Sequence, residues 1–329
     1  MTVLIWVVGI AVALIALIFG GFAVFTARTA RQVEKILPPR GRFIDVDGAN
    51  IHYIDEGSGP PLVLVHGLSG QHGNFTHSLL GLLRKNHRVI VLDRPGSGYS
   101  TRRRNASAAI ADQARTISRF IEALGLDRPI VVGHSLGGAI ALSLAVNHPE
   151  QVAGLVLLAP VTYKPEQMHP VFRGLAITSP ILRSLVARTV AIPMSIRYRH
   201  VVLDMVFGPD PVPRDYGTNG GGLLNLRPCS FVGASQDLMA VRDEQSGLTA
   251  RYGEIKVPVG IVYGTADRLL DPTAHRAALL EKLPGAECEL IEGGGHMILI
   301  CSAERCAAFI ARIAQRAAAG AATAEKVLT

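Results

Sequence analysis

Short runs of apolar and β-branched residues recur along most of the chain, and helical patterns separate them. The runs are typical of buried strands and occupy residues 62–65, 88–93, 130–132, 154–159, 259–263 and 287–291. Residues 42–55 add a hairpin around an Asp-Gly turn. Strands that alternate with helices predict an α/β fold, with a mostly parallel sheet between two layers of helices. Ligands of such sheets bind beyond the carboxyl ends of the strands.

The alternation stops between residues 161 and 256. This stretch carries apolar helical patterns, many arginines and a segment rich in proline and glycine at 208–222. It predicts a helical cap inserted into the sheet domain. The sheet domain is then expected in two parts, 42–160 and 257–316, with a C-terminal tail at 317–329.

The first apolar run differs from the others, because residues 3–25 contain no charged side chain. At about 1.5 Å per residue, a helix of this length crosses a hydrocarbon core about 30 Å thick. We expect a transmembrane helix rather than a signal peptide, because nothing basic precedes Trp6 and the run is long. A hydrophobic helix packed on the folded domain is the alternative.

A basic juxtamembrane linker, 26–41, follows the apolar run. We expect a single-pass protein of the bacterial inner membrane. By the positive-inside rule, the folded domain that follows the linker is expected to face the cytoplasm. The formal net charge of +7 comes with no recognisable nucleic-acid-binding motif, so anionic lipid headgroups are the expected partner and nucleic acid is not. The oligomeric state is not predicted.

The sequence Gly133-His134-Ser135-Leu136-Gly137 stands between a predicted strand and an Ala/Leu-rich helical stretch. A serine on such a sharp strand-to-helix turn is lifted clear of the backbone, and the flanking glycines allow close packing. The helix that starts there directs free N–H groups toward the serine. Ser135 is therefore the candidate nucleophile.

A nucleophilic serine needs a base that takes its proton and an acid that orients the base. Asp267 follows one late strand, and His296 lies in the glycine-rich loop after the last one. We predict that Asp267 is the acid and His296 the base, with Asp93 and Asp271 as alternative acids. The order Ser, Asp, His along the chain is the one expected for this fold.

Two backbone amides are expected to hold an oxyanion, one after the serine and one in an early strand-to-helix loop. Leu136 and Leu68 are the candidates, and Gly67 permits the backbone path that Leu68 needs. His66 is expected to hold this loop, and His134 to pack beside the serine. The side chains expected to line the substrate site are Leu68, His134, Phe172, Met194 and Met297.

Neither a metal ion nor a cofactor is predicted. The four cysteines make no zinc or redox spacing, and the histidines make no H-E-x-x-H pattern. Four scattered cysteines in a chain of this length are compatible with free thiols in a reducing compartment.

Together these motifs resemble the α/β-hydrolase fold family, from about residue 42 to residue 312. The resemblance rests on His66-Gly67, on the stretch 92–100 (Leu-Asp-Arg-Pro-Gly-Ser-Gly-Tyr-Ser), on the Gly-His-Ser-Leu-Gly-Gly elbow, and on Asp267 and His296. It implies a lid after the sixth strand, and Ser135 disfavours the epoxide hydrolases and haloalkane dehalogenases, which carry an aspartate there.

The resemblance implies a serine hydrolase that cleaves carboxylic esters or thioesters, of small-molecule or lipid-like substrates, through an acyl-enzyme. The alternatives are a serine-based C–C bond hydrolase, a cofactor-free haloperoxidase, or a non-catalytic binding protein on the same fold.

Overall fold

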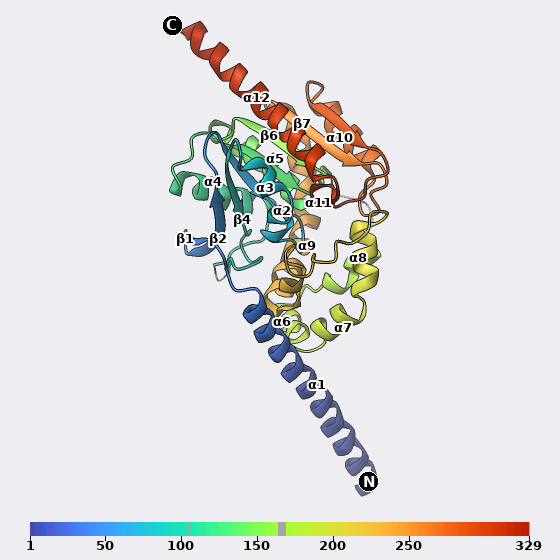
Figure 1. The fold of residues 1–329 in the computed structure, drawn as a ribbon. Coiled ribbons are helices and arrows are strands. Elements are labelled where there is room, and N and C mark those ends of the chain that lie inside the picture. Colours follow the sequence, from blue (N-terminus) through green and yellow to red (C-terminus); the bar gives the residue numbers. More distant parts are fainter. Residues whose placement is uncertain (104, 164–168, 329) are drawn as a thin grey trace.

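A single eight-stranded sheet organises the folded part of the chain (Figure 1). The computed structural model describes residues 1–103, 105–163 and 169–328, and at 242–246 and 321–328 it describes the backbone alone. The strand order is β1-β2-β4-β3-β5-β6-β7-β8. The strands are β1 Arg42–Val46, β2 Ala49–Glu56, β3 Pro61–Val65, β4 Arg88–Leu92, β5 Ile130–His134, β6 Gly154–Leu158, β7 Val259–Gly264 and β8 Glu287–Ile291. All the predicted strands, including the hairpin, are present.

The sheet is mostly parallel, as predicted. β2 pairs antiparallel with β1 and with β4, and every other neighbouring pair is parallel. The central strands are apolar at successive positions because helices cover both of their faces. In β3, for example, residues 62–65 are all fully buried.

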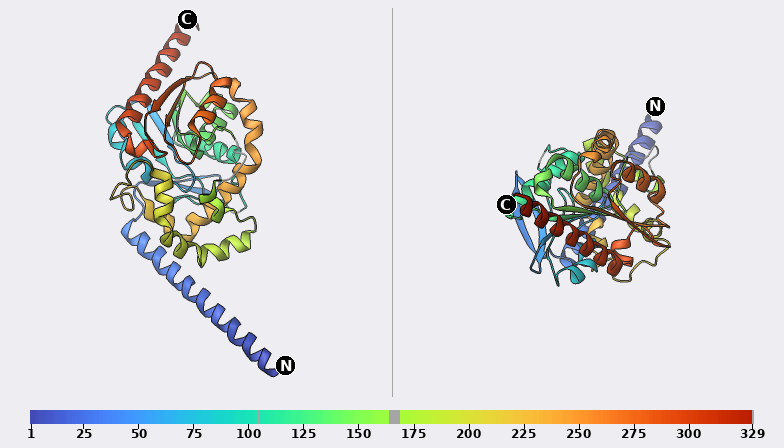
Figure 2. Two further views of the ribbon diagram at one scale, coloured as in Figure 1. Left: turned by 90° about the vertical axis from the view of Figure 1, so that its right-hand side faces the viewer. Right: turned by 90° about the horizontal axis from the view of Figure 1, so that it is seen from above.

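Two groups of helices enclose the sheet (Figure 2). The helices α4 (Ile110–Ala123) and α5 (Leu136–Asn147) contact each other, and α5 packs on β5 and β6. On the other face, α12 (Ala303–Leu328) packs on β6, β7 and α3 (Leu79–Leu83). The remaining elements of this part are α2 (Gly73–Thr76), η1 (Pro149–Gln151), α10 (Pro272–Lys282) and α11 (Ile298–Cys301).

A helical insertion separates β6 from β7, where the alternation of strands and helices lapses in the sequence. We call residues 159–258 the β6–β7 insertion; that it forms a separate cap stays a prediction. Its elements are η2 (Pro170–Leu175), α6 (Pro180–Arg188), α7 (Ala191–Arg197), α8 (Arg199–Phe207), η3 (Gly222–Leu226), α9 (Pro228–Ala250) and η4 (Tyr252–Glu254).

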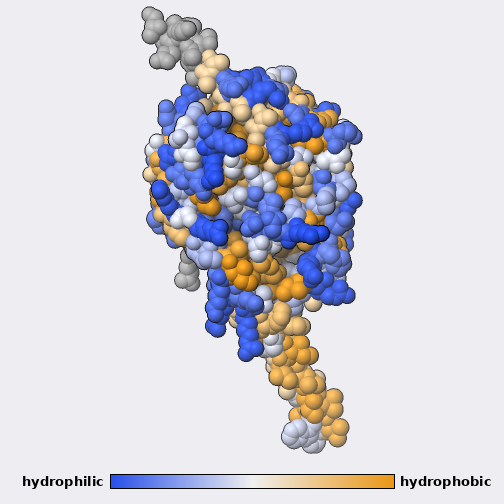
Figure 3. Space-filling model, in the orientation of Figure 1, coloured by the Kyte–Doolittle hydropathy of each residue, from blue (hydrophilic) through white to orange (hydrophobic). Residues whose placement is uncertain are grey.

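The N-terminal apolar run lies in one long helix, α1 (Thr2–Ile36). Its first part projects from the body of the molecule with exposed apolar side chains (Figures 1 and 3). Among the described residues, α1 is the one helix that is long and apolar enough to cross a membrane, judged by length and composition. The predicted linker, 26–41, is helical as far as Ile36, because no helix breaker occurs before Pro38-Pro39.

The second half of α1 docks on the β6–β7 insertion. It contacts α6, α7 and η3. Thr26 is buried, and its hydroxyl donates a hydrogen bond of 3.0 Å to the Thr189 carbonyl. At the other end of the body, α12 continues to Leu328 through the predicted tail, 317–329 (Figure 1). The alanines of this stretch favour the helix.

Candidate functional site

Ser135 occupies a strained turn between β5 and α5. Its φ angle is 53°, in the left-handed region that non-glycine residues rarely adopt. The turn needs its glycines, because a Cβ on Gly133 would lie 2.4 Å from the Gly137 carbonyl oxygen, and one on Gly137 would lie 2.1 Å from the Val65 carbonyl oxygen. Residues 133–137 therefore form the sharp turn that the sequence predicts. The exposed fraction of Ser135 in this turn is 9%.

The His296 ring and the Asp267 carboxylate form a buried pair. The Nδ1 atom of His296 lies 2.7 Å from Oδ2 of Asp267. Because a carboxylate only accepts, Nδ1 carries the proton and Nε2 is left as an acceptor. Burial alone would raise the pKa of Asp267, but His296 and the amides of Leu269 and Leu270 outweigh it and hold that pKa below its ordinary value.

His134 places this pair beside the elbow. Its Nε2 atom donates to the His296 carbonyl at 3.1 Å, and the two imidazole rings lie 4.9 Å apart. In the structure no hydrogen bond joins the described side chains of Ser135 and His296. Hydrogen bonds between a catalytic serine and histidine often tighten only in the complex with substrate.

The two alternative acids have other partners. Asp271 caps α10 and accepts hydrogen bonds from the amides of Thr273 and Ala274. Asp93 contacts two other histidines, described below. Of the three aspartates, Asp267 is the one that the structure pairs with His296.

The loop after β3 lies directly against Ser135. A Cβ on Gly67 would come within 2.8 Å of the Ser135 Cβ atom, so a glycine is required there. The Gly67 carbonyl accepts three hydrogen bonds, at 2.9 Å from His66 Nδ1, at 2.9 Å from Arg94 Nη2 and at 3.1 Å from the Gly70 amide. These donors fix the plane of the peptide that links Gly67 to Leu68.

That peptide plane determines the direction of the Leu68 amide. In a trans peptide the C=O and N–H groups point in opposite directions, so the Leu68 N–H points away from the three donors. The Ser135 carbonyl is held in the same way, by the amides of Gly138 (2.9 Å) and Val161 (3.1 Å), which orients the Leu136 N–H. Neither N–H donates to another residue of the described chain, so both are available to an anion.

His66 supports this loop as a neutral ring. Its Nε2 atom accepts from the Arg94 amide at 3.0 Å, so Nδ1 carries the proton that it donates to the Gly67 carbonyl. Burial, together with the nearby Arg94 charge, lowers the pKa of His66 to about 3. The ring is therefore part of the loop's framework.

The predicted substrate-lining residues differ in their surroundings. His134 and Met297 are buried beside the pair, and Leu68 is half-buried against the core. Met194, by contrast, is 44% exposed on α7, and Phe172 makes its ring contact with His169. The substrate role of all five side chains stays a prediction.

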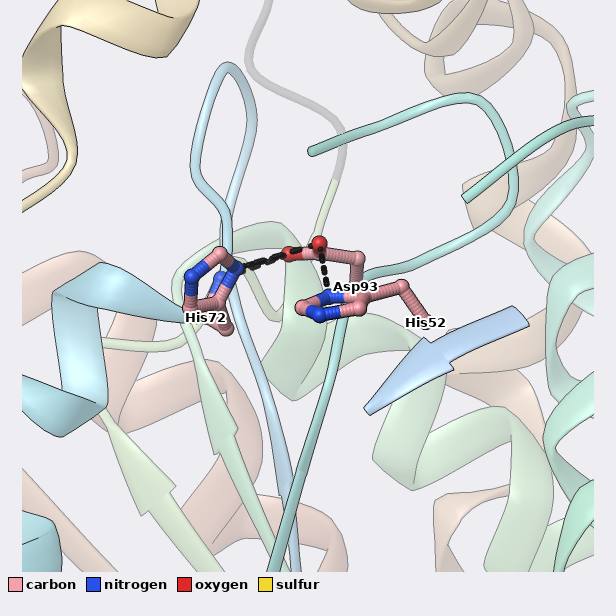
Figure 4. A group of neighbouring side chains, drawn as sticks. All are labelled: His52, His72 and Asp93. Atoms are coloured by element: carbon pink, nitrogen blue, oxygen red, sulfur yellow. Dashed lines mark hydrogen bonds and ion pairs between the residues drawn. The ribbon is translucent and has the colours of Figure 1, made fainter. Parts of the chain in front are cut away.

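His52, His72 and Asp93 form a second cluster, which the sequence analysis missed (Figure 4). Within the described part of the chain, it is the one group of His, Cys and acidic side chains close enough together to hold a metal ion. Asp93 lies 2.8 Å from Nδ1 of His52 and 3.1 Å from Nδ1 of His72. Burial alone would raise the pKa of Asp93, but the two histidines hold it well below its ordinary value.

Hydrogen bonding within the protein accounts for this second cluster. The Asp93 carboxylate also accepts from the amides of His72 (2.7 Å) and Tyr99 (2.8 Å), so its lone pairs are occupied. The cluster ties β2 to the loop after β4. Of its three residues, His72 lines a cavity of about 560 Å³ between the end of α1, β2 and α2–α3, away from Ser135.

Comparison with known proteins identifies the fold. A family model for the alpha/beta hydrolase fold matches residues 60–180. The dihydrolipoyllysine-residue acetyltransferase component of the acetoin cleaving system of Cupriavidus necator is 30% identical over 268 residues. The alignment covers 78% of this chain and 64% of that relative, so the chain spans less than two thirds of the relative's length.

Solved structures extend the similarity over almost the whole chain. A membrane phospholipase A superposes with a TM-score of 0.69 at 25% identity, covering 96% of this chain and 98% of that one. The enol-lactonase of Burkholderia xenovorans superposes with a TM-score of 0.67 at 20% identity, covering 83% of this chain and 100% of that one, which bears on the fold alone. The chain therefore has the α/β-hydrolase fold, and the solved structures that it resembles include lipases and esterases.

Proposed function

We propose that this protein is a membrane-anchored serine hydrolase that cleaves carboxylic ester or thioester bonds through an acyl-enzyme. The observation that carries the proposal is the buried Asp267–His296 pair, 2.7 Å apart, beside a serine on a strained elbow. The two oriented amides of Leu68 and Leu136 supply the remaining requirement, a site for a developing oxyanion.

The proposed reaction has two halves. The Ser135 oxygen attacks the ester carbonyl while His296 Nε2 takes the serine proton, and the Leu68 and Leu136 N–H groups hold the resulting oxyanion. The C–O bond to the alcohol breaks, and His296 returns the proton to that leaving oxygen. Water then attacks the acyl-enzyme by the same route and releases the acid and the free serine. Asp267 keeps Nδ1 of His296 protonated throughout.

Labelling with a fluorophosphonate probe tests the nucleophile. The purified wild-type protein is expected to be labelled and to hydrolyse p-nitrophenyl esters, whereas Ser135→Ala does neither. Ser107→Ala, at an exposed position outside the site, is the matched control and keeps both properties. Persistent labelling of Ser135→Ala contradicts the proposal.

The anchor is proposed from the character of α1 and of the helices that touch it. The apolar part of α1 is exposed, and the basic residues Arg28, Arg31, Lys35, Arg40 and Arg42 follow it. The neighbouring helices α6 and α7 also expose large apolar side chains, among them Ile181 (83%), Leu185 (54%) and Met194 (44%). Exposed apolar side chains beside a membrane helix can insert into the interfacial layer of a bilayer. Lipid-like esters are concentrated in that layer.

Membrane extraction tests the anchor, and protease protection tests its orientation. The protein is expected to stay in the membrane fraction after alkaline carbonate washing, and a variant with Leu14→Arg and Leu17→Arg is expected to leave it. The basic residues after the span predict that the catalytic domain faces the cytoplasm. Digestion of that domain by protease added outside intact spheroplasts contradicts this orientation.

A further inference from the structure

Arg94 is a fully buried arginine that joins the sheet to the β6–β7 insertion. It stands in the loop after β4, next to Asp93. Its Nε atom donates to the His66 carbonyl at 2.9 Å, and its Nη2 atom donates to the Gly67 carbonyl at 2.9 Å. Its Nη1 atom donates to Oδ2 of Asp237, on α9, at 2.7 Å. One guanidinium thus contacts both the loop beside Ser135 and a helix of the insertion.

Asp237 is equally buried, and other groups also hold its carboxylate. Arg102 pairs with its second oxygen, and Gln113 Nε2 lies 3.3 Å from the same oxygen. The Gln113 side-chain oxygen in turn accepts from Arg94 Nη1. The two charges compensate each other where water cannot reach them, because both side chains have an exposed fraction of 0%. A buried arginine that loses its carboxylate is strongly disfavoured.

The position of α9 therefore bears on the direction of the Leu68 N–H. Arg94 supplies one of the three donors on the Gly67 carbonyl, and that carbonyl shares its peptide plane with the Leu68 amide. If α9 shifts, Arg94 loses Asp237 and has to turn toward another acceptor or toward water. The carbonyls of His66 and Gly67 then lose the guanidinium, and two donors instead of three hold the peptide plane, His66 Nδ1 and the Gly70 amide.

We propose that Arg94 and Asp237 are positioning residues that couple the seating of α9 to the oxyanion hole. The inference rests on the proposed function, since it assigns the Leu68 amide to the oxyanion. In this scheme the hole is complete only while the insertion is in place against the sheet. A substrate that displaces α9 on entry is hydrolysed only after the helix has returned.

The first test is Asp237→Asn, which removes the charge but keeps the shape. We expect kcat for a short p-nitrophenyl ester to fall about 10- to 100-fold, somewhat less than is typical when an oxyanion donor is lost entirely. KM is expected to change less than about twofold, and the affinity for a trifluoromethyl ketone, whose adduct with Ser135 carries the oxyanion, to fall with kcat. Asp204→Asn, at an exposed ion pair with Arg268, is the matched control and keeps all three values.

A double variant separates an effect on the position of the Leu68 amide from an effect on the stability of the fold. Arg94→Met with Asp237→Leu replaces the buried ion pair by apolar side chains, a change that often preserves stability. Arg102 keeps the Gln236 side chain and the Pro95 carbonyl as partners. We expect a melting temperature near that of the wild type with kcat still at least 10-fold low. If Asp237→Asn does not fold, the kcat and melting temperature of this double variant test the proposal on their own.

The proposal is overturned if the double variant recovers kcat along with its melting temperature, or if folded Asp237→Asn keeps wild-type kcat and ketone affinity. Failure of the proposed function gives a different result, because Ser135→Ala then still turns over esters and still reacts with the fluorophosphonate.

Discussion

Gly67 and Ser135 are in such close contact that a single added carbon atom on Gly67 would lie 2.8 Å from the Ser135 Cβ. The two residues are far apart in the sequence, but β3 and β5 are parallel neighbours in the sheet and end at the same edge. The contact brings the loop that carries the Leu68 amide against the elbow. The spacing between serine and amide is therefore determined by backbone packing.

Gly67→Ala is expected to damage this spacing. The new methyl group has to push the β3 loop away from the elbow, which moves the Leu68 N–H by a few tenths of an ångström or more. We expect kcat/KM for p-nitrophenyl esters to fall about 100-fold, comparable to the loss of one oxyanion donor. Gly81→Ala in α3, where a Cβ meets nothing within 4 Å, is the matched control. Equal activity of the two variants argues against an oxyanion role for Leu68.

Asp267→Asn is expected to abolish most turnover without unfolding the protein. An amide can donate to Nδ1 of His296, which favours the tautomer with the proton on Nε2, where it cannot accept the serine proton. In serine hydrolases such a change costs about 10⁴-fold in kcat. Asp271→Asn at the cap of α10 is the comparison, expected to keep kcat. If Asp271→Asn loses activity and Asp267→Asn does not, the acid is misassigned.

Stability is expected to fall as the pH drops below 6.5, in part through His134. Burial and the nearby His296 lower the pKa of His134 to about 3 in the folded state, against 6.5 for an unperturbed histidine. Between these values the unfolded chain binds a proton that the folded chain does not, so stability is lost as the pH falls. Each such group contributes about 1.4 kcal/mol per pH unit, or about 2 kcal/mol between pH 6.5 and pH 5.

Urea unfolding of the protein in detergent at several pH values measures this effect. His134→Gln is expected to show a shallower loss of unfolding free energy than the wild type, with the remainder coming from groups such as His66. His200→Gln, at an exposed position on α8, keeps the wild-type slope. An unchanged slope in His134→Gln contradicts the prediction.

If the proposed function holds, Leu185→Ser on α6 is expected to slow hydrolysis of a lipid-like ester held in vesicles while leaving hydrolysis of a soluble short ester unchanged. Leu185 is 54% exposed on a helix that contacts α1, so its methyl groups are available to the bilayer interface. Leu290→Ser on β8, at a position 38% exposed outside the insertion, is the matched control. Equal losses in the two assays indicate a defect in folding instead.

Much of the fold could be predicted because each strand is marked locally. β5 and β6 are short apolar runs between helical patterns, and parallel strands bring whatever follows them to one edge. Ser135, Asp267, His296 and Leu68 each follow such a strand, so their common edge could be inferred without coordinates. The ends of α1 and α12 were harder to place, since charged or alanine-rich sequence beyond an apolar run is compatible with either a linker or a continued helix.

Two buried polar clusters of the structure could not be predicted. His52, His72 and Asp93 come from three separate segments with no motif spacing, and their proximity depends on β2 pairing antiparallel with β4. Arg94 and Asp237 are still further apart in the sequence. The long, weakly patterned insertion carries no signal for which of its polar residues turns inward. A buried ion pair of this type is visible only when the tertiary packing is known.

If α1 is the proposed membrane anchor, its unbroken course determines how the folded domain meets its substrates. With its apolar part in a bilayer, the remaining residues up to Ile36 form a stiff post about 16 Å long, which the Thr26–Thr189 hydrogen bond clamps to the insertion. A flexible tether lets a domain tumble and sample soluble molecules from every side. A helix that is docked on the β6–β7 insertion instead keeps the insertion turned toward the lipid. Substrates would then reach the domain mainly by diffusing within the plane of the membrane.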